Sequence, residues 1–379
     1  MIHLFVRTAL LCAVWIAVAG CDKGRKRPVQ KQTSDIVRYA EGFRMNQEGN
    51  ARRIDVTYPY QGATSGYTYL LVPKGETPPP HEDATRVIYT PVDKIVCTST
   101  THIPLLDYLG ETDALVGFPS PEYISSEKMR RRIDAGEVTD LGIDKGLNLE
   151  RLAVLQPDLV MGYTMTNDYG QFRQIESMGI PVVINAEYLE HHPLGRAEWI
   201  KFMGAFFGRD EEADSIFREI EERYLNVKAA VDTTSRHPTV FTGVVYGDAW
   251  FLPAGDNYAA RILDDAACQY LWADSEGNGF LELSFESVYA TAHAADLWIG
   301  TGPYGSRTAL AAADNRYTRF SAFRNNQVYN YDAQIGSGGG NLFLELGYLR
   351  PDLILRDLIR IAHPHVLPDH ELFFYRKLE

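Results

Sequence analysis

The sequence predicts an α/β protein with two Rossmann-like lobes, each built on a mostly parallel sheet, joined by one long α-helix. Three observations support this prediction. Short Val- and Ile-rich runs alternate with helical patterns from Arg86 onward, which is typical of parallel strands connected by helical crossovers. The alternation stops for about fifty residues after Asn185 and resumes after Pro238. A body of about 340 residues also exceeds the size at which single cores normally stop growing.

The first residues have the features of a bacterial export signal. Arg7 precedes an apolar run over residues 9–18, which is shorter than the roughly 20 residues of a membrane-spanning helix. The run ends in Val-Ala-Gly-Cys, which resembles the lipobox of bacterial lipoproteins. We therefore expect residues 1–20 to be removed, Cys21 to be lipidated, and residues 21–37 to form a flexible tether. A simple secretory signal is the alternative.

Composition argues against two classes of protein. The formal charge of the chain is −13; loss of Arg7 with the signal makes it −14, and residues 22–31 carry +4, which leaves about −18 on the rest of the chain. Nucleic acid is then an unsuitable partner, because phosphate binding needs a basic surface. Only Cys97 and Cys268 remain in the body, which is no disulfide framework, and both are expected to be small buried residues.

The N-terminal lobe is predicted over residues 38–190. Residues 54–59 and 67–72 resemble a pair of strands, so a small β appendage is expected before the lobe itself. The strands of the lobe are predicted at RVIYT, KIVCTS, ALVGFP, DLVMGY and PVVIN, with helices over 101–110, 148–156 and 168–178.

Residues 191–236 are expected to connect the lobes through a helix over 210–231. Ala213, Phe217, Ile220 and Tyr224 recur there at three- and four-residue spacings, and acidic residues crowd the first turn. A helix of about 22 residues is roughly 33 Å long, which is enough to reach from one lobe to the other.

The C-terminal lobe is predicted over residues 237–379. Its strands are expected at TVFTGVVY, QYLW, DLWIG and QVYNY, with helices over 258–267, 284–293, 316–324, 342–348 and 351–361.

One unit occurs in both lobes. LNLERL with QPDLV places Glu150 at a helix start before an apolar strand, and LSFESV with ADLWI does the same for Glu286. The order of elements and this paired motif resemble the substrate-binding proteins of ABC importers for ferric siderophores, haem and cobalamin, whose lobes are joined by a single rigid helix. The resemblance covers the chain from about Arg86 to the C-terminus. It implies that both glutamates dock against arginines of the permease; from position alone, each acid complements a helix N-terminus.

The ligand is expected beyond the C-terminal ends of the strands, where the loops of two facing sheets converge. Aromatic residues in these loops suit a flat macrocycle or an aromatic chelator, and Arg307 suits its negative charge. For each aromatic alone, packing beneath a loop is the simpler alternative. The candidate ligand-binding residues are Ser99, His102, Tyr163, Tyr246, Trp250, Tyr304 and Arg307.

Two further patterns are weaker. The GSGGGN loop at residues 336–341 lacks the Lys-Ser/Thr ending of a nucleotide-binding loop, so we expect a flexible surface loop, with anion binding as the alternative. No histidine pair has the i, i+4 spacing of a helical zinc site, so no direct metal site is expected.

The resemblance implies a monomeric, lipid-anchored protein of the cell envelope, on the periplasmic side, without a cofactor of its own. It would capture a ferric siderophore or related metal chelate between its lobes and deliver it to the ABC permease of the inner membrane. Cobalamin, another corrinoid or haem is the second choice of ligand.

An exported glycoside hydrolase using Glu150 and Glu286 is the remote alternative. That chemistry requires two carboxyls within about 5–10 Å of each other. Equivalent helix starts in separate lobes would instead lie far apart, so no catalytic residue is expected.

Overall fold

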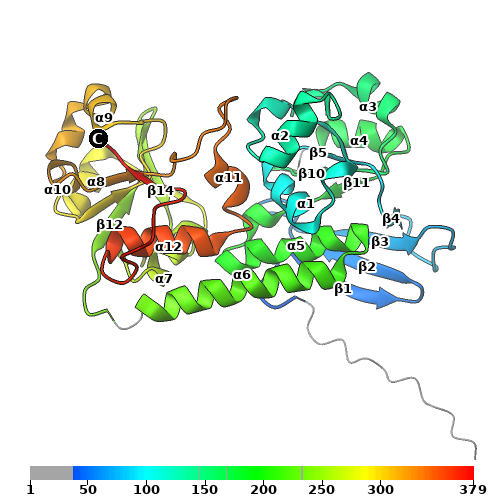
Figure 1. Ribbon diagram of the computed structural model, residues 1–379, viewed down its shortest axis with the longest axis horizontal. Coiled ribbons are helices and arrows are strands. Elements are labelled where there is room, and N and C mark those ends of the chain that lie inside the picture. Colours follow the sequence, from blue (N-terminus) through cyan, green and yellow to red (C-terminus); the bar gives the residue numbers. More distant parts are fainter. Residues whose placement is uncertain (1–36, 145, 168, 232–233) are drawn as a thin grey trace, which may run out of the picture. The chain divides into compact units, whose positions relative to one another are not determined.

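The computed structural model describes residues 37–144, 146–167, 169–231 and 234–379 (Figure 1). The signal, Cys21 and the tether up to residue 36 lie outside the described residues. Within them, no helix combines the length and the apolar character needed to cross a membrane. The body is α/β, with two separate five-stranded sheets joined through a long helix, so the predicted fold class is confirmed.

The N-terminal lobe is built on the sheet β11-β10-β5-β6-β7, in which all neighbouring strands are parallel. Its three central strands are almost wholly buried, as expected when helices cover both faces. The strands are β5 (Ile95–Cys97), β6 (Leu115–Phe118), β7 (Thr139–Asp140), β10 (Leu159–Gly162) and β11 (Val182–Ile184), with a small hairpin of β8 (Gly142–Ile143) and β9 (Gly146–Leu147). The helices are η1 (Thr100–His102), α1 (Ile103–Leu109), η2 (Thr112–Ala114), η3 (Pro121–Tyr123), α2 (Glu127–Asp134), α3 (Leu149–Leu155), α4 (Gly170–Ser177) and η4 (Glu187–Leu189).

The C-terminal lobe is built on the sheet β15-β12-β17-β18-β19, which is parallel except at its edge strand β19. Its strands are β12 (Thr239–Thr242), β15 (Gln269–Tyr270), β17 (Leu297–Ile299), β18 (Val328–Asn330) and β19 (Arg376–Lys377). Its helices are α7 (Tyr258–Asp265), α8 (Phe285–Ala292), α9 (Arg307–Ala313), η5 (Asn315–Arg319), α10 (Ser321–Arg324), α11 (Leu342–Leu346) and α12 (Pro351–Ala362). Cys97 and Cys268 are free and buried, as predicted.

The predicted strand TVFTGVVY is two strands. Gly243 separates β12 from β13 (Val244–Tyr246), with φ of 78°, and a Cβ at this position would lie 2.1 Å from the carbonyl oxygen of Phe251. Only glycine fits this backbone without strain. The break directs β13 away from the parallel sheet into an antiparallel sheet with β14 (Ala249–Pro253) and β16 (Phe280–Leu283), which the sequence did not predict.

The N-terminal appendage has four strands, β1 (Phe43–Glu48), β2 (Ala51–Val56), β3 (Tyr67–Pro73) and β4 (Arg86–Thr90). The prediction that RVIYT belongs to the sheet of the N-terminal lobe was wrong, because β4 pairs in parallel with β3. The appendage nevertheless continues that lobe. The backbone N–H of Ile184 in β11 donates to the Tyr69 hydroxyl at 2.9 Å, and Arg86 is ion-paired with Glu176 of α4.

Two consecutive helices connect the lobes. The second, α6 (Asp210–Val231), covers the predicted residues; it packs on α5 (Pro193–Phe207) and on α12 of the C-terminal lobe, and Figure 1 shows it running along both. The first was not recognised as a separate helix, because α5 is buried on nearly all sides and carries no amphipathic pattern.

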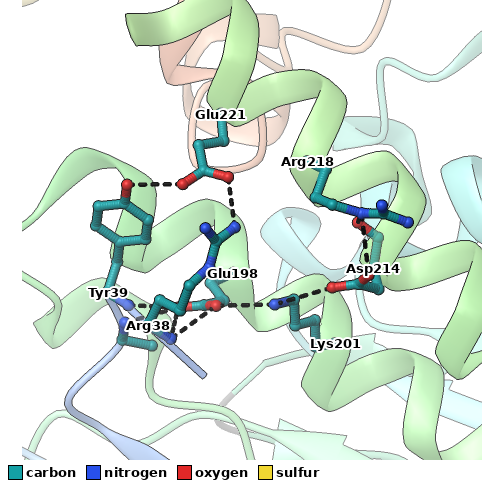
Figure 2. Close-up of polar contacts among 8 residues, drawn as sticks. Arg38, Tyr39, Glu198, Lys201, Asp214, Arg218 and Glu221 are labelled. Atoms are coloured by element: carbon teal, nitrogen blue, oxygen red, sulfur yellow. Dashed lines mark hydrogen bonds and ion pairs between the residues drawn. The ribbon is translucent and has the colours of Figure 1, made fainter. Parts of the chain in front are cut away.

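Two buried carboxylates, Glu198 of α5 and Glu190 shortly before α5, bind residues 38–42 at the start of the described chain, and Figure 2 shows the contacts of Glu198. Glu198 of α5 accepts hydrogen bonds from the backbone N–H groups of Arg38, Tyr39 and Ala40, at 2.7–3.0 Å, and pairs with Lys201 at 3.0 Å. Glu190 accepts from the backbone of the next two residues and from Trp199 Nε1. Residues 38–42 therefore lie beside α5 and α6.

The glycine-rich loop is not free at the surface. A Cβ on Gly338 would lie 2.1 Å from the carbonyl oxygen of Glu122, and a Cβ on Gly340 would lie 1.9 Å from that of Tyr123. The glycines thus allow the C-terminal lobe to approach the backbone of the N-terminal lobe closely. This close packing replaces the expectation of a flexible loop.

Next to this loop, Glu345 of α11 links the lobes. Its carboxylate accepts hydrogen bonds from the backbone N–H groups of Ser125, at 2.6 Å, and Ser126, at 2.9 Å, at the start of α2. Burial raises the pKa of Glu345 from its usual value of 4.5 to about 7, and the nearby Asp107 adds to the rise. The two backbone N–H donors favour the carboxylate, but burial outweighs them, so the folded protein favours the protonated form of Glu345.

This shift predicts a pH-dependent stability. Because the pKa is higher in the folded protein, the contribution of Glu345 is fully present below about pH 4.5 and is lost as the pH rises through 7. Glu345→Gln imitates the protonated acid at every pH. The melting temperature of the variant relative to wild type should therefore rise between pH 5 and pH 8, by on the order of 2–4 °C in thermal denaturation. A difference that does not change with pH would contradict this assignment.

Candidate ligand-binding cavity

A cavity of about 640 Å³ lies where strand ends of both lobes meet. On the C-terminal side its lining follows β12, β17 and β18, through residues such as Gly243, Gly300 and Tyr331. On the N-terminal side it includes Met165, which follows β10, and Tyr188, which follows β11. This is the edge at which the sequence predicted a ligand, and the volume suits a small-molecule site.

The wall of the cavity is mostly aromatic and apolar, and part of it is unusually exposed. Tyr246 is 80% exposed and Phe280 is 70% exposed. Met165, Phe251 and Leu344 are further exposed apolar residues that line the same cavity. Exposed apolar side chains gathered around one cavity indicate a binding surface, whereas isolated ones would need no explanation. The remaining aromatic lining residues are Tyr188, Tyr258, Tyr331, Phe343, Tyr348 and Tyr375.

Only one candidate residue from the sequence, Tyr246, lines this cavity. Ser99 caps η1, and its hydroxyl lies 2.7 Å from that of Thr101. Tyr163 donates its hydroxyl hydrogen to Asp144 at 2.9 Å. Tyr304 packs partly buried against the core, one residue beyond the lining residue Pro303.

Arg307 and Trp250 were expected to contact the ligand, but neither side chain lines the cavity. The Arg307 guanidinium lies 4.6 Å from the ring centre of Phe323 and donates to Asn326, outside the cavity. The Trp250 side chain is fully buried, and its Nε1 donates to the carbonyl of Thr242 at 2.9 Å. Both side chains are held by packing within the C-terminal lobe.

His102 also lies in the interior and outside the cavity lining. It is fully buried, its two ring nitrogens have no hydrogen-bond partner among the described residues, and burial lowers its pKa to about 3. His102 is therefore neutral at physiological pH.

The sequence missed one cation in the cavity wall. Arg196 comes from α5, which the sequence treated only as part of a connection. Its guanidinium lies 3.8 Å from the ring centre of Tyr258 and 4.4 Å from that of Tyr348. No sequence pattern within residues 191–236, which were assigned to the connection between the lobes, indicated that Arg196 lines the cavity.

The paired glutamates occupy equivalent places in their lobes. Glu150 is the second residue of α3, whose N-cap is Asn148, and Glu286 is the second residue of α8, whose N-cap is Ser284. Both are exposed. Glu286 is ion-paired with Arg316 at 3.1 Å, whereas no ion pair joins Glu150 to another described residue.

The aspartate of each repeated motif has the same structural task. Asp158 accepts a hydrogen bond from the backbone N–H of Lys94, just before β5, and Asp296 accepts one from Thr239 at the start of β12. Each aspartate thus ties the start of its own strand to the neighbouring parallel strand.

The two glutamates do not form a catalytic pair. Helix α3 packs on β6 of the N-terminal lobe, α8 packs on β14 of the C-terminal lobe, and Figure 1 shows the two helices well separated. Glycoside hydrolysis needs carboxyls within about 10 Å, so this arrangement does not suit that reaction.

Comparisons with known proteins agree with this architecture. A sequence profile of the family described as periplasmic binding protein matches residues 95–335. An uncharacterized lipoprotein of Methanocaldococcus jannaschii is 24% identical over 376 residues, covering 92% of this chain and 86% of the relative.

Two solved structures share the fold. A periplasmic haem-binding protein from Pseudomonas aeruginosa aligns with a TM-score of 0.55 and 17% identity, over 76% of this chain and 98% of that one. The siderophore-binding protein FhuD from Vibrio cholerae, solved with Fe3+-Desferal, aligns with a TM-score of 0.53 and 16% identity, over 72% of this chain and 100% of that one.

Proposed function

This chain belongs to the periplasmic binding protein family, and on that premise we propose that it captures a metal chelate and delivers it to an ABC permease. Proteins of this family bind substrates for transporters and are not enzymes. A ferric siderophore is the first choice of ligand, and haem or a corrinoid such as cobalamin is the second.

The observation that carries the proposal is the exposed aromatic wall of the cavity. Tyr246 and Phe280 expose large rings to solvent beside a cavity that both lobes line. Rings of this kind gain free energy by stacking on a flat or aromatic ligand, which a small polar solute would not offer. Two fold relatives bind haem and Fe3+-Desferal respectively; both ligands are metal chelates, and haem is also a flat aromatic macrocycle.

Delivery would use the two exposed glutamates. Glu150 and Glu286 stand at equivalent helix starts in the two lobes, so a permease with two related halves would meet one carboxylate from each lobe. A lipid on Cys21 would hold the protein at the membrane, on the periplasmic side of the cell envelope.

Binding is tested with protein that starts after Cys21, titrated by calorimetry with a ferric siderophore panel, haem and cobalamin. At least one chelate should bind with a micromolar or lower Kd, and Tyr246→Ala should weaken it by about five-fold, because a stacking ring contributes about 1 kcal/mol. Tyr58→Ala removes a tyrosine that is 52% exposed on the appendage, outside the cavity lining, and should change nothing. If no chelate binds, the proposal is wrong.

A further inference from the structure

Arg196 is fixed in the cavity wall by contacts that occupy only some of the N–H donors of its guanidinium. Its Nε donates to the carbonyl oxygen of Glu190 at 3.1 Å, and Nη2 donates to that of Tyr188 at 3.0 Å. The rings of Tyr258 and Tyr348 cover the guanidinium from the C-terminal lobe. These contacts fix the orientation of the guanidinium, yet they use only two of its five N–H groups.

No carboxylate among the residues that the structure describes forms an ion pair with Arg196, although its charge partly opposes the rise that burial causes in the pKa of Glu187. Glu190 lines the same cavity, but its carboxylate accepts hydrogen bonds from the backbone N–H groups of Glu41 and Gly42 and from Trp199 Nε1. A partly buried cation is normally paired, so an unpaired one in an apolar cavity favours an anion from outside the chain.

Tyr258 supplies a second donor at the same place. It lines the cavity, its side chain is buried at 8% exposure, and its hydroxyl has no hydrogen-bond partner among the described residues. A buried hydroxyl without a partner costs free energy, which an acceptor on a bound ligand would offset. Burial raises the pKa of Tyr258, so the phenol remains protonated and able to donate.

We propose that Arg196 and the Tyr258 hydroxyl form an anion subsite that selects chelates carrying a carboxylate. This inference rests on the proposed function and narrows its ligand class: among siderophores, haem and corrinoids, the carboxylate-bearing forms are preferred. A carboxylate can accept hydrogen bonds from the unused N–H groups of Arg196 and from the Tyr258 hydroxyl. Hydrogen bonds in which a partner is charged are about twice as strong as neutral ones.

The test uses pairs of related ligands in which one member carries free carboxylate and the other does not. They are haem and its dimethyl ester, a cobalamin monocarboxylic acid and cobalamin, and N-succinyl ferrioxamine B and its N-acetyl analogue. Each member is titrated by calorimetry into wild type, Arg196→Gln and Arg196→Lys. In at least one pair, wild type should bind the carboxylate form at least about ten-fold more tightly than the form without it. Arg196→Gln should remove that preference, and Arg196→Lys should keep part of it.

The variants separate charge selection from a purely structural role. If Arg196 only joined the lobes by stacking, Arg196→Gln would weaken both members of a pair equally and leave their ratio unchanged, which would overturn the inference while the chelate-binding proposal stood. Equal binding of both members by wild type would also overturn it. If no member of any pair binds, the proposed function fails and the inference falls with it.

Discussion

Replacing Glu198 with alanine should lower the free energy of unfolding by about 3–5 kcal/mol. The carboxylate is fully buried, pairs with Lys201 and accepts the backbone N–H groups of three consecutive residues, 38–40 (Figure 2). Alanine leaves these donors in the interior without an acceptor, and each unsatisfied buried group costs about 1–3 kcal/mol unless water replaces the lost oxygen. Chemical denaturation monitored by circular dichroism measures the loss.

Two controls show whether the loss comes from the buried carboxylate. Glu198→Gln keeps one acceptor oxygen and should cost clearly less than alanine. Glu219→Ala removes an exposed acid of α6 that, within the described part of the chain, pairs only with the exposed Arg223, and should change stability by less than about 0.5 kcal/mol. A Glu198→Ala protein as stable as the Glu219→Ala protein would show that the contact contributes nothing to folding.

The fold could be predicted where a pattern in the sequence is local. The apolar stripe correctly predicts a helix over residues 210–231, because the spacing of Ala213, Phe217 and Ile220 and the acidic first turn all lie within the helix. The same holds for α3 and α8, whose N-cap residues, Asn148 and Ser284, are themselves part of the repeated motif.

The cavity could be predicted only in part, because its lining depends on which way side chains point. The sequence placed Trp250 in a loop after a strand. In the structure a tight turn ends before it, so Trp250 lies within β14 and points into the core, while the adjacent Phe251 lines the cavity. A shift of one residue along a strand exchanges the two faces, and composition cannot fix that register.

Contacts between segments that are distant in the sequence could not be predicted from local patterns. Arg196 meets the rings of Tyr258 and Tyr348 only after the two lobes have packed together, and Glu198 meets a backbone about 160 residues earlier in the chain. The glycine-rich loop is a similar case, because its glycines are needed where the loop packs against the backbone of Glu122 and Tyr123 in the other lobe.

Reversing the charge at both proposed docking positions, with Glu150→Arg and Glu286→Arg together, should reduce chelate uptake by cells at least about ten-fold. The family resemblance implies arginines on the permease at these contacts, and like charges placed together across an interface cost several kcal/mol. Uptake of the chelate identified in the binding panel is measured with labelled metal, in cells that carry the native permease and this protein as their only binding subunit.

Two measurements distinguish lost docking from lost folding or lost binding. Neither glutamate lines the cavity, so the Kd of the double variant for the chelate should equal that of wild type. Glu211→Arg with Glu222→Arg makes the same change in net charge at two exposed positions of α6 and should leave uptake intact. The single variants should differ, because Arg316 already neutralises part of the charge of Glu286, whereas Glu150 is exposed without such a pair among the described residues. Glu150→Arg is therefore expected to be the more harmful of the two, and normal uptake by the double variant would remove both residues from the docking surface.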